Sequence, residues 1–112
     1  MDKQSSLLER FFRYVKIDTQ SDEESETSPS TGKQRDLASL LAAELKDLGL
    51  DVDYDEEHCY VYAYLPSNAN TDTSEDLGFI SHLDTSPAVS GKDVKPQIIR
   101  AYDGNDDILD PE

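Results

Sequence analysis

The most informative part of the sequence runs from Leu77 to Pro87 and reads LGFISHLDTSP. Its apolar start, residues 77–80, has the composition of a buried strand, and polar residues then end the strand abruptly. Side chains two residues apart share one face of a strand. We therefore expect His82 and Asp84 to lie together at its carboxyl end, with Leu83 facing the core. Open α/β sheets bind ligands at this end of their strands, which makes the pair a candidate site.

Two kinds of chemistry fit a histidine beside a carboxylate. The imidazole can ligate a metal while the carboxylate orients the ring, or the pair can act as acid and base. A hydrogen-bonded structural histidine explains a single His-x-Asp pattern equally well. The Ser, Thr and Pro that follow favour a functional site, because they form a tight polar loop at a strand end. The residues alone leave these interpretations open.

The composition restricts the classes of partner. The 112 residues suffice for one modest domain or for one part of a larger domain. Asp and Glu number 25 against 10 Lys and Arg, so the formal net charge is −15. Nucleic acids and anionic membranes attract basic patches, so we expect neither as a partner. The acidic residues predict a well-solvated surface.

No targeting or membrane segment is apparent. No apolar run approaches the roughly 20 residues that a membrane span needs. Residues 1–18 mix acids and bases and lack the uninterrupted apolar core of a signal peptide. The single cysteine, Cys59, permits no internal disulfide. Cysteine usage therefore fits a reducing compartment, and we expect a cytoplasmic protein.

Two helices are predicted in the first half of the chain. Ser6 and Glu9 have the spacing of a capping box, which predicts a helix from about Ser6 to Lys16. Thr31 to Gln34 form a second candidate box. Leucines then follow at helical spacing, and Gly49 stands where a helix C-terminal glycine belongs. The acidic, Ser-rich segment 20–30 between the helices is expected to be an exposed, mobile loop.

Two short strands follow the second predicted helix. Leu50 to Tyr54 alternates apolar and acidic residues, and Cys59 to Leu65 alternates tyrosines with small apolar residues. The pair predicts a β-hairpin, and the apolar bodies on both faces of its second strand predict cover on both sides. His58, in the turn, is expected to be solvated, and Cys59 to be a small buried hydrophobe. The fold class is therefore α/β: two helices, a β-hairpin, and a central strand that ends at His82.

Four segments of the sequence resemble the tripeptide aminopeptidases of the M20 family of co-catalytic zinc peptidases. HLDTSP within GFISHLDTSP is specific to this branch, whereas His-x-Asp followed by Pro is shared more widely. The chain departs from the family by extra residues near positions 4–6 and by an unusually acidic loop at 22–26. The segments are residues 1–21 (MDKQSSLLERFFRYVKIDTQS), 29–50 (PSTGKQRDLASLLAAELKDLGL), 78–99 (GFISHLDTSPAVSGKDVKPQII) and 101–104 (AYDG).

The resemblance implies a role for each residue of the motif. His82 matches the family's first zinc-ligating histidine. Asp84 matches the aspartate that orients this imidazole and is counted as catalytic. The complete family site holds two zinc ions, and its other ligands and its general base have no counterpart in this chain. The lid domain through which relatives dimerise has none either, so a homodimer is expected only of a full-length form.

The expected function follows from this resemblance. Residues 1–112 would be the N-terminal part of an incomplete catalytic domain, in an aminopeptidase that removes the N-terminal residue from tripeptides. The chain alone should be inactive, because it offers one recognisable zinc ligand and a catalytic zinc takes about three from protein. Two alternatives stay open. One is an inactive, stand-alone acidic interaction module, and the other is a different M20 activity, namely a dipeptidase or an N-acyl amino acid deacylase.

Overall fold

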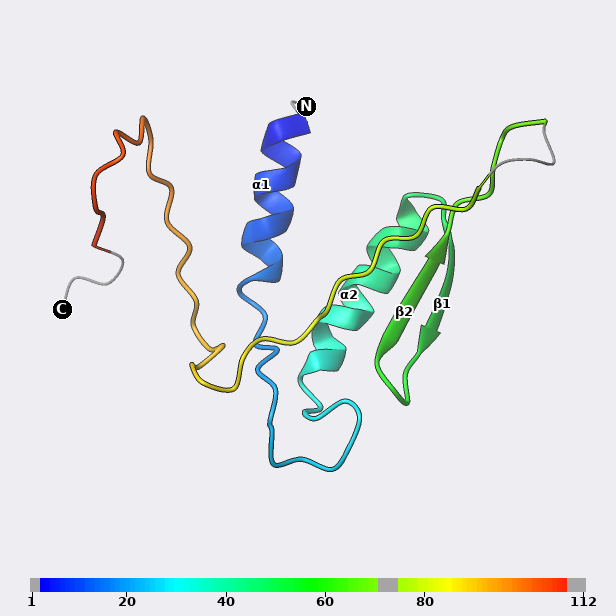
Figure 1. Ribbon diagram of the computed structural model, residues 1–112, viewed down its shortest axis with the longest axis horizontal. Coiled ribbons are helices and arrows are strands. Elements are labelled where there is room, and N and C mark those ends of the chain that lie inside the picture. The colour runs from blue at the N-terminus through cyan, green and yellow to red at the C-terminus, as the bar shows by residue number, and fades with distance from the viewer. Residues whose placement is uncertain (1–2, 71–74, 109–112) are drawn as a thin grey trace.

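A computed structural model of the chain describes residues 3–70 and 75–108 (Figure 1). The described part contains two helices, α1 (Lys3–Tyr14) and α2 (Gln34–Asp47), and two strands, β1 (Asp51–Asp55) and β2 (Tyr60–Tyr64). The strands pair as an antiparallel hairpin. In Figure 1, α2 lies between α1 and this hairpin. The architecture is a small α/β arrangement, which confirms the two predicted helices and the predicted hairpin.

Both predicted capping boxes are wrong. Because α1 already includes Lys3, Ser6 lies inside the helix and cannot be its N-cap. The residue before α2 is Lys33, which has helical backbone angles and makes no side-chain cap hydrogen bond. The Thr31 hydroxyl instead donates to the backbone carbonyl of Gln20 at 2.8 Å. A threonine hydroxyl bonds to whichever acceptor lies within reach, and the tertiary structure brings the Gln20 carbonyl within reach of Thr31.

The predicted end of α2 is confirmed. Gly49 has a φ of +85°, a left-handed conformation that costs glycine little because it lacks a Cβ. The Gly49 and Leu50 backbone N–H groups donate to carbonyls of the last turn of the helix, at 2.9 and 3.2 Å. These bonds satisfy carbonyl groups that would otherwise be unpaired at the helix end. The chain then turns directly into β1.

The hairpin has one packed face and one open face. Val52 pairs with Ala63 and Tyr54 with Val61, and this face is turned toward α2. The opposite face aligns the row Tyr60, Tyr62 and Tyr64 with aspartates of β1, and all three tyrosines are exposed. The prediction that the sheet is covered on both sides is therefore wrong for this chain. Helix α2 covers one face, and none of the described residues covers the other.

The core is small. The buried apolar residues of the described part are Leu37, Ala38, Ala42 and Cys59. Ala38 and Ala42 lie four residues apart on one face of α2, where small side chains permit a close approach of the sheet. Cys59 is buried as predicted, and this burial raises the pKa of its thiol. The predicted role of Cys59 as a small packed hydrophobe is confirmed.

The predicted central strand does not form. Residues 77–84 have no strand structure, and Leu77, Phe79 and Ile80 are 82%, 91% and 102% exposed. A strand needs a neighbouring strand to satisfy its backbone groups, and none of the described residues pairs with residues 77–84. The one pairing nearby is an isolated parallel bridge between Gln20 and Thr85. Residues 102–108 likewise have no helix or strand.

The structure also bears on the question of a membrane span. Within residues 3–70 and 75–108, no helix combines the length and apolar character that crossing a membrane requires.

Candidate functional site

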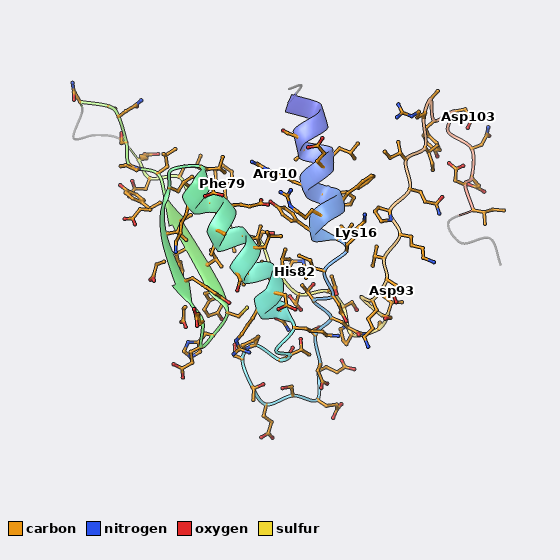
Figure 2. All side chains as sticks on the ribbon, turned by 180° about the vertical axis from the view of Figure 1, so that it is seen from behind. Arg10, Lys16, Phe79, His82, Asp93 and Asp103 are labelled. Atoms are coloured by element: carbon orange, nitrogen blue, oxygen red, sulfur yellow. The ribbon has the colours of Figure 1, made fainter. Side chains whose placement is uncertain are left out.

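His82 and Asp84 lie side by side, as their spacing predicts. The Nδ1 atom of His82 is 3.1 Å from the Oδ1 atom of Asp84. The His82 side chain is 82% exposed and that of Asp84 is 42% exposed, whereas Leu83 between them is half-buried. Figure 2 shows His82 beside the first turns of α2, close to the end of α1. Because the contact to Asp84 uses Nδ1, the Nε2 atom is the ring nitrogen available to a metal or to a transferred proton.

A backbone clamp holds the loop that carries this pair. The Thr85 N–H donates to the Thr19 carbonyl at 3.1 Å, and the Thr85 carbonyl accepts the Ser21 N–H at 3.0 Å. The Ser21 hydroxyl donates to the same carbonyl at 2.8 Å. Thr85 directly follows Asp84, so the clamp fixes the backbone one residue beyond the candidate site. The segment after α1 therefore positions the His82–Asp84 loop.

Asp18 stabilises the segment that forms this clamp, and the sequence analysis did not identify it. Its Oδ1 atom accepts the backbone N–H of Gln20 at 3.0 Å, and its Oδ2 atom accepts from Lys33 Nζ at 2.9 Å. The Gln20 N–H, and then Lys33, lower the pKa of the Asp18 carboxyl. A carboxylate two residues before a backbone donor is a common turn pattern. No local pattern could reveal that the turn pairs with Thr85.

An apolar hollow adjoins the candidate pair. It is open to solvent and has a volume of about 430 Å³. Helix α1 contributes Phe11 and Tyr14 to its lining, α2 contributes Leu37, and the motif contributes His82 and Leu83. The pair thus stands at the edge of an apolar surface that lies between the two helices.

A second histidine–aspartate pair provides an internal comparison. His58 Nδ1 is 2.8 Å from Asp55 Oδ2, and the His58 N–H donates to Asp55 Oδ1 at 3.1 Å. The hydrogen bond to Asp55 raises the pKa of His58. This pair closes the hairpin turn, and its histidine is half-exposed. The prediction that His58 is a solvated turn residue is confirmed.

The described residues supply part of a metal site at most. Within residues 3–70 and 75–108, no three His, Cys, Asp or Glu side chains gather at distances suited to one metal ion. His82 with its carboxylate partner nevertheless has the arrangement of a metal-ligating imidazole and the group that orients it. A catalytic zinc takes about three protein ligands, so this chain fits one of them.

Comparisons with known proteins show which sequences this chain resembles. No family model matches the chain. A relative named peptidase T from Alkaliphilus oremlandii is 57% identical over 108 residues, which are 96% of this chain and 26% of the relative. The chain is similar to an N-terminal portion of peptidase T. Peptidase T from Desulfitobacterium hafniense is 56% identical over the same shares, and that from Geobacillus thermodenitrificans is 50% identical over 95% of this chain and 26% of its own length.

The coverage defines what this similarity establishes. The chain spans about a quarter, 26%, of the length of these peptidase T relatives. The similarity includes nearly all of this chain, and it agrees with the expectation from the HLDTSP motif. The relatives are named as peptidases, and this name says nothing of zinc ions or of His82 and Asp84, whose roles stay predictions.

Proposed function

We propose that this chain supplies one zinc ligand to the active site of a peptidase T, an aminopeptidase that releases the N-terminal residue of tripeptides. The observation that carries the proposal is the His82–Asp84 contact at 3.1 Å, within a sequence 57% identical to a peptidase T. In the proposal, the remaining ligands and the general base come from parts of the peptidase with no counterpart in this chain. The chain alone is then inactive.

His82 and Asp84 have complementary roles in the proposal. Asp84 accepts a hydrogen bond from the Nδ1–H of His82, which fixes the tautomer, orients the ring and leaves the Nε2 lone pair for zinc. When bound, zinc polarises the peptide carbonyl and lowers the pKa of a coordinated water. In the proposal, His82 holds the zinc ion and Asp84 orients the His82 ring. Neither residue takes the proton of the coordinated water. The family resemblance further supports two zinc ions per complete site, a small peptide as substrate, a cytoplasmic location and a homodimeric full-length form.

A chimera tests the proposal directly. The corresponding segment of the Alkaliphilus oremlandii peptidase T is replaced by this chain, and tripeptide hydrolysis and zinc content are measured. The chimera should be active with zinc bound, and its His82→Ala variant should lose one zinc and most activity. The matched control is His58→Ala, which removes the other aspartate-paired histidine and should change neither property. The isolated chain with excess zinc should not hydrolyse the tripeptide.

The result can also contradict the proposal. If His82→Ala keeps both metals and normal turnover, His82 is a structural residue. If the chimera hydrolyses dipeptides or N-acyl amino acids in preference to tripeptides, the activity is a different one of the same family. A purified isolated chain that hydrolyses the tripeptide in proportion to its concentration would show that its site is complete.

Asp84→Asn in the same chimera separates orientation from ligation. The amide keeps the shape of the side chain but accepts a hydrogen bond less strongly. Loss of such a partner typically costs about 10–100-fold in metal affinity or activity. We expect kcat to fall by that order while both zinc ions stay bound at saturating metal. Loss of a metal at saturating zinc would identify Asp84 as a ligand, and unchanged turnover would exclude the orienting role.

A further inference from the structure

The carboxylate of Asp18 connects the start of α2 to the backbone near the candidate site. Its two oxygens have different partners: Oδ2 accepts from Lys33 Nζ at 2.9 Å, and Oδ1 accepts the Gln20 N–H at 3.0 Å. The Asp18 side chain is 19% exposed and that of Lys33 is 32% exposed, so the pair is partly shielded from solvent. One side chain thus links the residue that precedes α2 with the backbone at Gln20.

The backbone that Asp18 holds is the backbone that Thr85 pairs with. Gln20 and Thr85 form the isolated parallel bridge, and the neighbours of Gln20 provide its two hydrogen bonds. The Gln20 side chain adds a hydrogen bond from Nε2 to the Pro87 carbonyl at 3.0 Å. A continuous series of contacts therefore runs from Lys33 through Asp18 and Gln20 to Thr85, the residue next to Asp84.

Gly91, in the loop that follows the motif, lies close to the Asp18 carboxylate. A Cβ atom at position 91 would lie 2.6 Å from Asp18 Oδ1 and 3.4 Å from Thr85 Oγ1. The first distance is too short for any real contact. Oδ1 would have to shift, and the same atom accepts the Gln20 N–H at 3.0 Å. The absence of a side chain at Gly91 therefore permits the present position of Asp18.

We propose that Asp18 is a positioning residue for His82, that Lys33 holds its carboxylate in place, and that Gly91 leaves room for this carboxylate. The inference rests on the proposed function, because it concerns the position of a metal ligand. Asp18 touches neither the substrate nor the metal. It fixes the backbone at Gln20, which fixes Thr85 and so the loop that presents the His82 imidazole to the rest of the site. Physically connected groups of this kind can carry coupling between sites.

The experiment uses the full-length protein with zinc bound. Zinc retention is measured against graded chelator, kcat and KM are measured on a tripeptide, and hydrogen exchange is followed on the peptide that contains Thr85. Asp18→Ala should weaken zinc retention and lower kcat by about 10-fold, the lower end of the range for partners that orient ligands. KM should change little, and exchange at Thr85 should accelerate. Asp18→Asn keeps an acceptor for Gln20 but loses the charge that binds Lys33, so its effects should be smaller.

Asp22→Ala is the matched control. Asp22 lies in the same loop, and its Oδ1 atom also accepts a backbone N–H two residues on, that of Glu24 at 3.0 Å. The contact holds only its own turn and includes no atom of residues 85–87. Asp22→Ala should leave zinc retention, kcat and exchange at Thr85 unchanged.

Gly91→Ala tests the coupling independently of Asp18→Ala. The added methyl group should displace the Asp18 carboxylate and reproduce the losses of Asp18→Ala. When both substitutions are combined, the methyl group occupies space that the carboxylate has left, so the double variant should lose little more than either single variant. Independent effects would instead multiply. This pattern also decides the case if Asp18→Ala alone folds poorly.

The outcomes separate the two proposals. If His82→Ala leaves zinc content unchanged, the proposed function fails. If His82→Ala removes zinc while Asp18→Ala and Gly91→Ala behave like Asp22→Ala in all three measurements, the proposed function stands and the positioning role of Asp18 is overturned.

Discussion

Leu37 and Leu77 have the same side chain in opposite surroundings. Leu37, on α2, is 9% exposed, whereas Leu77, in the segment after the hairpin, is 82% exposed. Helix α2 packs against the hairpin, and Leu37 lies in the hollow to which α1 contributes Phe11 and Tyr14. The segment after the hairpin has equally apolar side chains, but no described element covers them. Apolar composition creates a tendency to be buried, and the partner surface decides whether burial occurs.

The candidate site lies where these two regions meet. Within the described part of the chain, the backbone hydrogen bonds that join residues 75–108 to the helices and their connecting loop are those of Thr85. His82 and Asp84 immediately precede this residue. Hydrogen bonds at Thr85 and Pro87 therefore attach the loop of the site to the packed unit, whereas residues 77–80 before it are exposed.

The largest expected difference is in hydrogen exchange along the 112-residue chain. Amides in the middle of α2 are hydrogen-bonded and partly covered by the hairpin, whereas amides of residues 77–80 have no backbone partner among the described residues. We expect protection in α2 to exceed that in residues 77–80 by roughly 100-fold or more, because local opening costs range from near zero to the global value. Nuclear magnetic resonance with amide assignment measures both. Equal protection would show that residues 77–80 are paired in solution.

Truncation of the two leucines compares the same regions energetically. Leu37→Ala should destabilise the 112-residue chain by about 2–4 kcal/mol, because it removes a buried side chain and leaves a cavity. Leu77→Ala, the matched control, should change stability by less than about 0.5 kcal/mol, as exposed positions do. Urea denaturation gives both values. A large effect of Leu77→Ala would contradict the exposed position of this segment.

The contact between α1 and α2 should be weaker than the contact between α2 and the hairpin. The Tyr14 hydroxyl and the Arg13 guanidinium, in the last turn of α1, both donate to the Glu44 carboxylate of α2. Burial, and then the hydrogen bond to Glu44, raise the pKa of Tyr14. Tyr14→Phe should cost about 0.5–1.5 kcal/mol, the net value of one hydrogen bond. Tyr62→Phe on the open face of the sheet is the control, and an equal loss there would contradict the assignment.

The smallest expected effect concerns the hairpin turn and its pH dependence. The hydrogen bond to Asp55 raises the pKa of His58, so the folded chain favours the protonated ring. This contribution to stability is complete below the unfolded-state pKa of about 6.5 and is lost as the pH rises through the folded-state pKa. Asp55→Asn retains an oxygen that can accept the His58 N–H but removes the negative charge. It should return the pKa of His58 toward its ordinary value.

Titration of the His58 ring by nuclear magnetic resonance measures this change. Thermal melting at pH 5.5 and pH 8 should show a slightly smaller pH dependence in Asp55→Asn than in the parent chain. A pKa of His58 that is the same in both chains would show that Asp55 does not hold the protonated ring.

Features that depend on near neighbours in sequence could be predicted. The leucine period and Gly49 defined α2, and alternation defined the hairpin. The expectation that His82 and Asp84 lie together assumed a strand that does not form, yet the structure places their side chains 3.1 Å apart. Each of these features requires atoms within a few residues of one another. Local geometry therefore determines them before the chain has a tertiary structure.

Features that depend on distant partners could not be predicted. Ser6 and Thr31 each have the spacing to Glu9 and Gln34 that a capping box requires. Ser6 nevertheless lies inside α1, and the Thr31 hydroxyl donates to the Gln20 carbonyl. The contact of Asp18 with Lys33 spans 15 positions, and the bridge from Gln20 to Thr85 spans many more. No periodic pattern marks such pairs, because each forms only when separate elements come together.

Backbone geometry and the order of nearby side chains account for the helices, the hairpin and the contact of His82 with Asp84. The open face of the hairpin, the exposure of residues 77–80 and the connection from Asp18 and Thr85 to α2 arise in the folded chain. Burial and long-range hydrogen bonding require a second surface, and the position of that surface is a property of the whole fold.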